Sequence, residues 1–249
     1  MALNEMGAPA PKKEMVIFYL IDTSGSMEGQ KIGQVNQAME EVVPLLRDEV
    51  SKANDDVEIK IAILQFSSGC SWVTPETGPV SVQDARWNRM NAEGLTDFGE
   101  AIKELNSKLS KEKFLYSSTG HYAPTIILLS DGEPTDDWEE PLEKLKKNDW
   151  FKVSTKIAFN IESNKDTLVK FVGNPEAVID VTNVNALKTM IKFVTIRSSQ
   201  INSGRSTNTN GQNLDTPEDK AAAIATVVNN ASYNVDGDIS IDDLETFQP

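Results

Sequence analysis

Three short polar segments of the sequence hold oxygen-bearing side chains that could bind a metal ion. The first, 22–26, reads Asp-Thr-Ser-Gly-Ser, so an aspartate and two serines alternate. The second, 94–97, reads Gly-Leu-Thr-Asp, and the third, 130–132, reads Ser-Asp-Gly. The candidate ligands are Asp22, Ser24, Ser26, Thr96 and Asp131. Carboxylate and hydroxyl oxygens are hard ligands, which favour Mg²⁺, Mn²⁺ or Ca²⁺ over zinc.

The elements around these segments alternate between apolar runs and amphipathic stretches. Short continuous apolar runs are typical of strands buried on both faces, and apolar residues at helical spacing indicate helices. The predicted strands are 15–21, 57–66, 125–129, 156–161 and 177–181, with a hairpin over 71–82. The predicted helices are 31–53, 97–109, 138–150, 165–172 and 184–196. Gly25 is expected to allow the backbone angles that the first polar segment needs.

This alternation predicts an α/β fold, a Rossmann-like three-layer sandwich with a mostly parallel central sheet and an antiparallel edge strand. Ligands of such sheets bind at the carboxyl ends of the strands. The segments at 22–26 and 130–132 directly follow predicted strands. We therefore expect the three segments to meet at one edge of the sheet.

The order Asp-x-Ser-x-Ser, then Thr, then Asp-Gly resembles the metal-ion-dependent adhesion site (MIDAS) of von Willebrand factor A (VWA) domains. The resemblance covers about 15–199, most of the chain. The runs LIDTSGSMEGQKI, GLTDFGEAI and IILLSDGEPTD are similar to bacterial members, as is FVGNPEAVIDVTNVNALKTMIKFVTI. Within the family, the chain most resembles the tellurite-resistance-associated, TerY-like group.

The resemblance implies how the metal is held. Ser24, Ser26 and Thr96 would bind it directly, and Asp22 and Asp131 would act directly or through water. One coordination position would stay open for an Asp or Glu of a partner protein. Mg²⁺ is the expected ion, with Mn²⁺ and Ca²⁺ as alternatives. Asp97 follows Thr96 directly and could replace or supplement it.

The function implied by the resemblance is recognition rather than catalysis. The chain would be a scaffold or adaptor in a bacterial stress-response or phosphorylation-linked complex, beside a kinase and a phosphatase and connected with tellurium resistance. The alternative enzyme is a metal-dependent phosphotransferase or hydrolase of the haloacid-dehalogenase type. Such enzymes need a second aspartate two residues after the first, as general acid, and Ser24 stands there.

Other enzyme classes lack their motifs. A serine hydrolase needs a base, and His121, the single histidine, lies in the polar run SSTGHYAP, where we expect an exposed loop residue. The sequence contains neither a Gly-x-Ser-x-Gly elbow nor a phosphate-binding loop ending in Gly-Lys-Ser/Thr.

Composition limits the partners and the compartment. The net charge of −14 disfavours binding to nucleic acid or an anionic membrane. A single cysteine, Cys70, excludes an internal disulfide and a thiolate metal cluster. We find no signal peptide and no apolar run long enough to span a membrane, so we expect a cytoplasmic protein.

Composition also divides the chain into an N-terminal tail (1–14), a VWA domain (15–201), a polar linker (202–215) and an acidic C-terminal segment (216–249). Thr216 and Pro217 predict a helix start in the last of these. A loop that resembles an EF-hand follows, and a further alternative function is a calcium-responsive interaction protein that binds Ca²⁺ through this C-terminal loop. Its candidate ligands are Asn234, Asp236, Asp238, Ser240 and Asp243. Ser232 stands where the pattern expects Asp, and the other interpretation is an acidic tail that docks on the domain or stays mobile.

Overall fold

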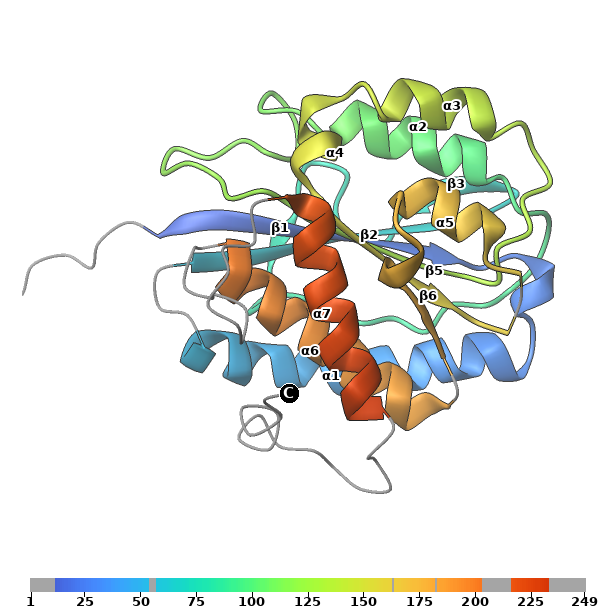
Figure 1. Cartoon of the computed structure of the whole chain (residues 1–249), viewed down its shortest axis with the longest axis horizontal. Coiled ribbons are helices and arrows are strands. Elements are labelled where there is room, and N and C mark those ends of the chain that lie inside the picture. Colours follow the sequence, from blue (N-terminus) through green and yellow to red (C-terminus); the bar gives the residue numbers. More distant parts are fainter. Residues whose placement is uncertain (1–11, 54–56, 163, 182, 203–215, 233–249) are drawn as a thin grey trace, which may run out of the picture.

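Parallel strands form the centre of the computed structural model, and helices cover both faces of the sheet (Figure 1). The structure describes residues 12–53, 57–162, 164–181, 183–202 and 216–232. The sheet has the order β3-β2-β1-β5-β6-β7, and β4 also pairs with β2. The strands are β1 (Lys13–Asp22), β2 (Val57–Ser67), β3 (Gly69–Trp72), β4 (Val80–Ser81), β5 (Thr125–Ser130), β6 (Thr155–Asn160) and β7 (Val178–Asp180).

Two layers of helices enclose this sheet. Figure 1 shows α1 and α6 on one side, and α2 and α3 on the other. The α-helices are α1 (Gln30–Ala53), α2 (Phe98–Lys108), α3 (Glu139–Leu145), α4 (Asp149–Val153), α5 (Asp166–Val172), α6 (Val184–Asn202) and α7 (Pro217–Ser232); the short 3₁₀ helices are η1 (Gly25–Met27) and η2 (Pro175–Ala177). The predicted three-layer α/β fold with a mostly parallel sheet is therefore confirmed.

The central strand β1 is buried on both faces and pairs with a parallel strand on each side. Its residues from Met15 to Ile21 are all completely inaccessible to solvent, as expected for a strand covered on both faces. β1 pairs in parallel with β2 on one side and with β5 on the other. The carboxyl ends of β1, β2 and β5 therefore lie at the same edge of the sheet.

Two predicted elements differ from the structure. The segment predicted as a hairpin over 71–82 instead runs along β2, because β3 and β4 each pair antiparallel with β2. The helix predicted over 138–150 is two helices, α3 and α4. Asn148 separates the two helices. Its side chain accepts hydrogen bonds from the backbone N–H groups of Trp150 and Phe151 and so caps the start of α4.

The predicted helix start at Thr216 is also present. Thr216 Oγ1 accepts a hydrogen bond of 3.0 Å from the N–H of Asp219, whose carboxylate accepts one of 3.3 Å from the N–H of Thr216. This reciprocal cap begins α7, and α7 contacts α6 and β6.

The division of the chain at 202–215 stays a prediction. The candidate calcium ligands lie outside the described residues. Among the residues described, no helix is both long and apolar enough to cross a membrane.

Candidate metal centre

Asp22 is the last residue of β1, and its side chain is completely buried. Its Oδ1 accepts a hydrogen bond of 2.9 Å from the backbone N–H of Ser24, and its Oδ2 accepts one of 2.6 Å from Ser130 Oγ. Burial raises the pKa of Asp22, although the hydrogen bonds from Ser130 and Ser24 act in the opposite direction. A carboxylate of this kind is strongly stabilised by a cation placed next to it.

The two serines of the first loop (23–29) bring their hydroxyl groups together. Ser24 Oγ and Ser26 Oγ lie 3.0 Å apart in a hydrogen bond. Ser24 is buried, whereas Ser26 is exposed. The pair therefore reaches from the buried carboxylate of Asp22 towards solvent, as ligands must if a partner is to approach the ion.

Backbone hydrogen bonds join the first loop to the second loop (82–97). The N–H of Gly25 donates to the carbonyl of Gly94 at 3.0 Å, and the N–H of Glu93 donates to the carbonyl of Thr23 at 2.9 Å. A Cβ at Gly25 would lie 3.1 Å from the oxygen of Gly94, so a side chain here would press on the carbonyl that the N–H of Gly25 binds. The prediction that Gly25 supplies backbone angles special to glycine is wrong, because Gly25 does not have a positive φ. Gly94, in the second loop, does have one, with φ of +80°.

The second loop is joined in turn to the third loop (131–138). The N–H of Thr96 donates to Thr135 Oγ1, and the N–H of Thr135 donates to the carbonyl of Thr96, both at 2.9 Å. Thr96 is buried, with 5% of its surface exposed. The structure thus ties together the three loops that carry four of the candidate ligands, and the first of these loops directly follows Asp22.

The carboxylate of Asp97 binds the backbone at the turn between β2 and β3. Its Oδ2 accepts a hydrogen bond of 2.7 Å from the N–H of Gly69, and its own N–H donates to the carbonyl of Ser67. Asp97 therefore stabilises the turn between β2 and β3. This contact favours Thr96 over Asp97 as the ligand from the second loop.

Acidic side chains of the third loop have other roles. Asp136 accepts hydrogen bonds from the N–H groups of Gly99 and Glu100, at 3.0 and 3.2 Å, and so caps the start of α2. Glu133 and Asp137 are exposed. Of this loop's acids, Asp131 is the one that is buried.

Asp131 forms an ion pair through one carboxylate oxygen and has no hydrogen-bond partner for the other. Its Oδ2 lies 2.9 Å from Nζ of Lys31, a residue of α1, and the Asp131 side chain is only 3% exposed. Its Oδ1 is buried and has no hydrogen-bond partner. Buried polar atoms almost always have partners, so this oxygen indicates a missing donor, water or ion. Sequence reasoning did not find Lys31, because nothing local connects residues 100 positions apart.

The donor set as a whole fits a hard divalent cation. It consists of two buried carboxylates and three hydroxyl groups, without nitrogen or sulfur. Within the described residues, no group of three or more His, Cys, Asp or Glu side chains could hold a metal. A site in this part of the chain would therefore rely on hydroxyl as well as carboxylate oxygens.

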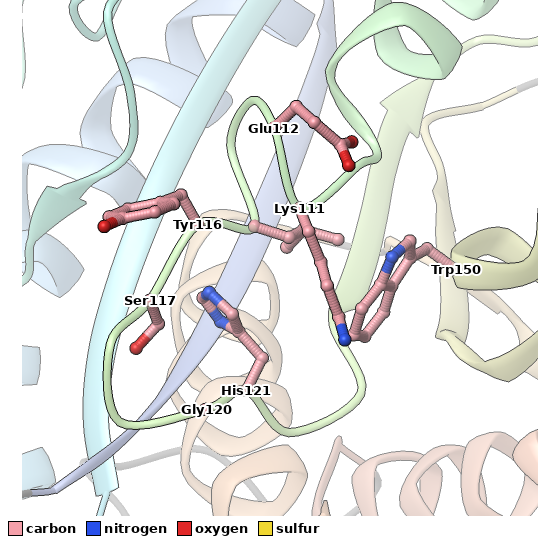
Figure 2. Close-up of a pocket in the computed structure, with 8 residues that line it drawn as sticks. Lys111, Glu112, Tyr116, Ser117, Gly120, His121 and Trp150 are labelled. Carbon is pink, nitrogen blue, oxygen red and sulfur yellow. The ribbon is translucent and has the colours of Figure 1, made fainter.

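A cavity of about 670 Å³ lies elsewhere in the molecule (Figure 2). Its lining residues are Lys111, Glu112, Leu115, Tyr116, Ser117, Gly120, His121 and Trp150. His121 forms a β-bridge with Glu14, near the start of β1, so the cavity is at the opposite end of that strand from Asp22. His121 is half-buried, and both of its ring nitrogens are buried without a hydrogen-bond partner, which corrects the prediction of an exposed histidine.

Curated relatives share this domain within much longer chains. The chain is 26% identical over 194 residues to the collagen alpha-5(VI) chain of Mus musculus, covering 76% of this chain and 7% of that one. It is 28% identical over 140 residues to the inter-alpha-trypsin inhibitor heavy chain H4 of Bos taurus, covering 53% and 14%. The chain therefore spans a small fraction of the length of either relative.

Solved structures share the fold. A von Willebrand factor type A protein from Catenulispora acidiphila matches with a TM-score of 0.53 at 18% identity, covering 75% of this chain and 43% of that one. The pilus adhesin SpaC from Lactobacillus rhamnosus GG matches with a TM-score of 0.55 at 14% identity, covering 75% and 30%. The family model for the von Willebrand factor type A domain matches residues 17–193, so the chain belongs to that family.

Proposed function

We propose that this chain is a divalent-metal-dependent protein-binding module and not an enzyme. Domains of this family commonly act as metal-dependent interaction modules. Ser24, Ser26 and Thr96 would hold the ion directly, with Asp22 and Asp131 bound to it directly or through water. A bound divalent ion supplies a Lewis-acidic position that can accept a carboxylate oxygen from an Asp or Glu of a partner.

The unpartnered Oδ1 of Asp131 is the observation that carries this proposal. It is a buried carboxylate oxygen, and the three loops around it are held in place by their own hydrogen bonds. Few of the proposed ligands carry charge, which leaves the ion able to attract a further carboxylate. Mg²⁺ is the ion we propose, with Mn²⁺ and Ca²⁺ as the alternatives.

Calorimetry with each of the three ions tests the proposal. We expect the intact protein to bind one ion per chain at this site, and Asp22→Ala to lose that binding. Absence of binding to the intact protein would exclude the proposal. Hydrolysis of p-nitrophenyl phosphate that depends on Asp22 would instead support the haloacid-dehalogenase alternative.

The biological setting rests on the sequence resemblance to the TerY-like group. We propose a cytoplasmic scaffold or adaptor in a bacterial stress-response complex, beside a kinase and a phosphatase. Affinity capture from the source cell, with Mg²⁺ and with EDTA, tests this setting. The proposed partners should be captured with Mg²⁺ by the intact protein and lost both with EDTA and with Asp22→Ala.

A further inference from the structure

Lys31 introduces a positive charge into a centre that otherwise has only oxygen ligands. Its Nζ lies 2.9 Å from Oδ2 of Asp131, and its side chain is 22% exposed. The partner carboxylate is almost completely buried, so the pair is screened by solvent much less than a surface pair would be. Lys31 is the second residue of α1, close in sequence to the serines of the first loop.

Charge balance shows what this contact does. Asp22 and Asp131, when both are ionised, carry two negative charges, which match the two positive charges of a divalent ion. The Lys31 ammonium therefore leaves the loaded site with one net positive charge. Like charges in a poorly screened site repel, so Lys31 must weaken the binding of the metal. The same excess charge favours an incoming carboxylate.

We propose that Lys31 sets the specificity of this centre by lowering its affinity for the metal and raising the affinity of the loaded site for a carboxylate. The inference rests on the proposed function and names the residue that controls its selectivity. Lys31 acts through Asp131 and through charge, and it is a positioning residue rather than a ligand. The lysine also supplies a counter-charge for Asp131 when metal is absent.

Lys31→Met tests the inference, because methionine keeps an unbranched apolar side chain without the charge. Lys60→Met is a matched control: Lys60 Nζ lies 2.8 Å from Glu14, and its side chain is 25% exposed. That pair is at the start of β1, whereas Asp22 is at its end. Binding of Mn²⁺ is measured by calorimetry. Binding of acetate to the Mn²⁺-loaded proteins is measured by water-proton relaxation, which also detects weak ligands.

We expect Lys31→Met to bind Mn²⁺ roughly tenfold more tightly and acetate roughly tenfold more weakly than the unmodified protein. Lys60→Met should match the unmodified protein in both. Unchanged or weaker Mn²⁺ binding by Lys31→Met, or unchanged acetate binding, would overturn the role of Lys31 and leave the metal centre in place. Failure of the unmodified protein to bind Mn²⁺ would overturn the proposed function as well.

Discussion

Ser130 Oγ donates a hydrogen bond of 2.6 Å to Oδ2 of Asp22 and accepts one of 2.8 Å from the N–H of Gly132. The first contact connects the ends of two neighbouring strands, β1 and β5. The second holds the start of the third loop next to Asp131. Ser130 therefore fixes the two carboxylates of the candidate metal centre relative to each other.

Replacing Ser130 with alanine should destabilise the metal-free protein. The variant leaves both a buried carboxylate oxygen and a buried N–H without a partner, which costs about 1–3 kcal/mol. Urea unfolding in EDTA measures the change. Ser107 is the control, because its hydroxyl group is exposed on α2 and Ser107→Ala should cost less than about 0.5 kcal/mol. Equal costs for the two variants would contradict the role given to Ser130.

Gly94→Ala should disturb the second loop and with it Thr96. The residue has φ of +80°, and a Cβ there would lie 2.5 Å from Ser68 Oγ. Gly173 has nearly the same φ, +83°, but an added Cβ would meet nothing within 4 Å. We expect Gly173→Ala to cost about 1 kcal/mol of unfolding free energy and Gly94→Ala to cost more. Calorimetry should show weakened Mg²⁺ binding for Gly94→Ala alone.

Metal binding should raise the thermal stability of the protein. An ion that binds the folded state alone adds about 2.7 kcal/mol when its concentration is 100 times the dissociation constant. Asp22→Asn keeps the shape of the side chain but removes its charge, and we expect it to abolish the increase in Tm on adding Mg²⁺. Asp149→Asn, a change at an exposed surface residue, should keep the increase. A full increase in Asp22→Asn would show that the ion binds elsewhere.

Lys156 and Tyr19 should give opposite dependences of stability on alkaline pH. Burial lowers the pKa of Lys156, whose Nζ donates to the carbonyls of Phe151 and Ser154. Burial raises the pKa of Tyr19 to about 12, although its hydrogen bond with Thr195 acts in the opposite direction. The folded state thus releases the lysine proton at lower pH than the unfolded state, and the tyrosine proton at higher pH.

The signs follow from proton linkage. As pH rises through the lowered pKa of Lys156 towards 10.5, the contribution of this lysine to stability improves. The free energy of unfolding of the unmodified protein should therefore rise relative to that of Lys156→Met. As pH rises from 10 towards 12, the contribution of Tyr19 to stability is lost. The free energy of unfolding of the unmodified protein should therefore fall relative to that of Tyr19→Phe. Urea unfolding between pH 8 and 11 measures both differences. Differences of the same sign would contradict the burial of one of the two groups.

Much of the fold could be predicted because burial leaves a local signature. The continuous apolar run of β1 and the helical spacing in α1 are visible without tertiary information. The error at 71–82 has a physical cause: the turn residues Pro75, Gly78 and Pro79 indicate an interruption but not which strand the flanking segments pair with. The partner of both segments is β2, which only the assembled sheet determines.

The five candidate ligands could be proposed from the sequence, because their segments directly follow a predicted strand or lead into a predicted helix. Their supporting contacts could not. The role of Ser130 depends on the strand register that pairs Ile21 with Leu129, and the contact of Lys31 with Asp131 depends on how α1 packs beside the third loop. The hydrogen bond from Gly69 to Asp97, which favours Thr96 as the proposed ligand, also depends on the folded arrangement of β2 and β3.

Anomalous diffraction from crystals grown with Mn²⁺ tests the central claim most directly. We predict one strong Mn²⁺ peak at the end of β1, within bonding distance of the hydroxyl oxygens of Ser24, Ser26 and Thr96, with a coordination position left to solvent. No peak there, or a site whose open position is filled by a side chain of the same chain, would contradict the account.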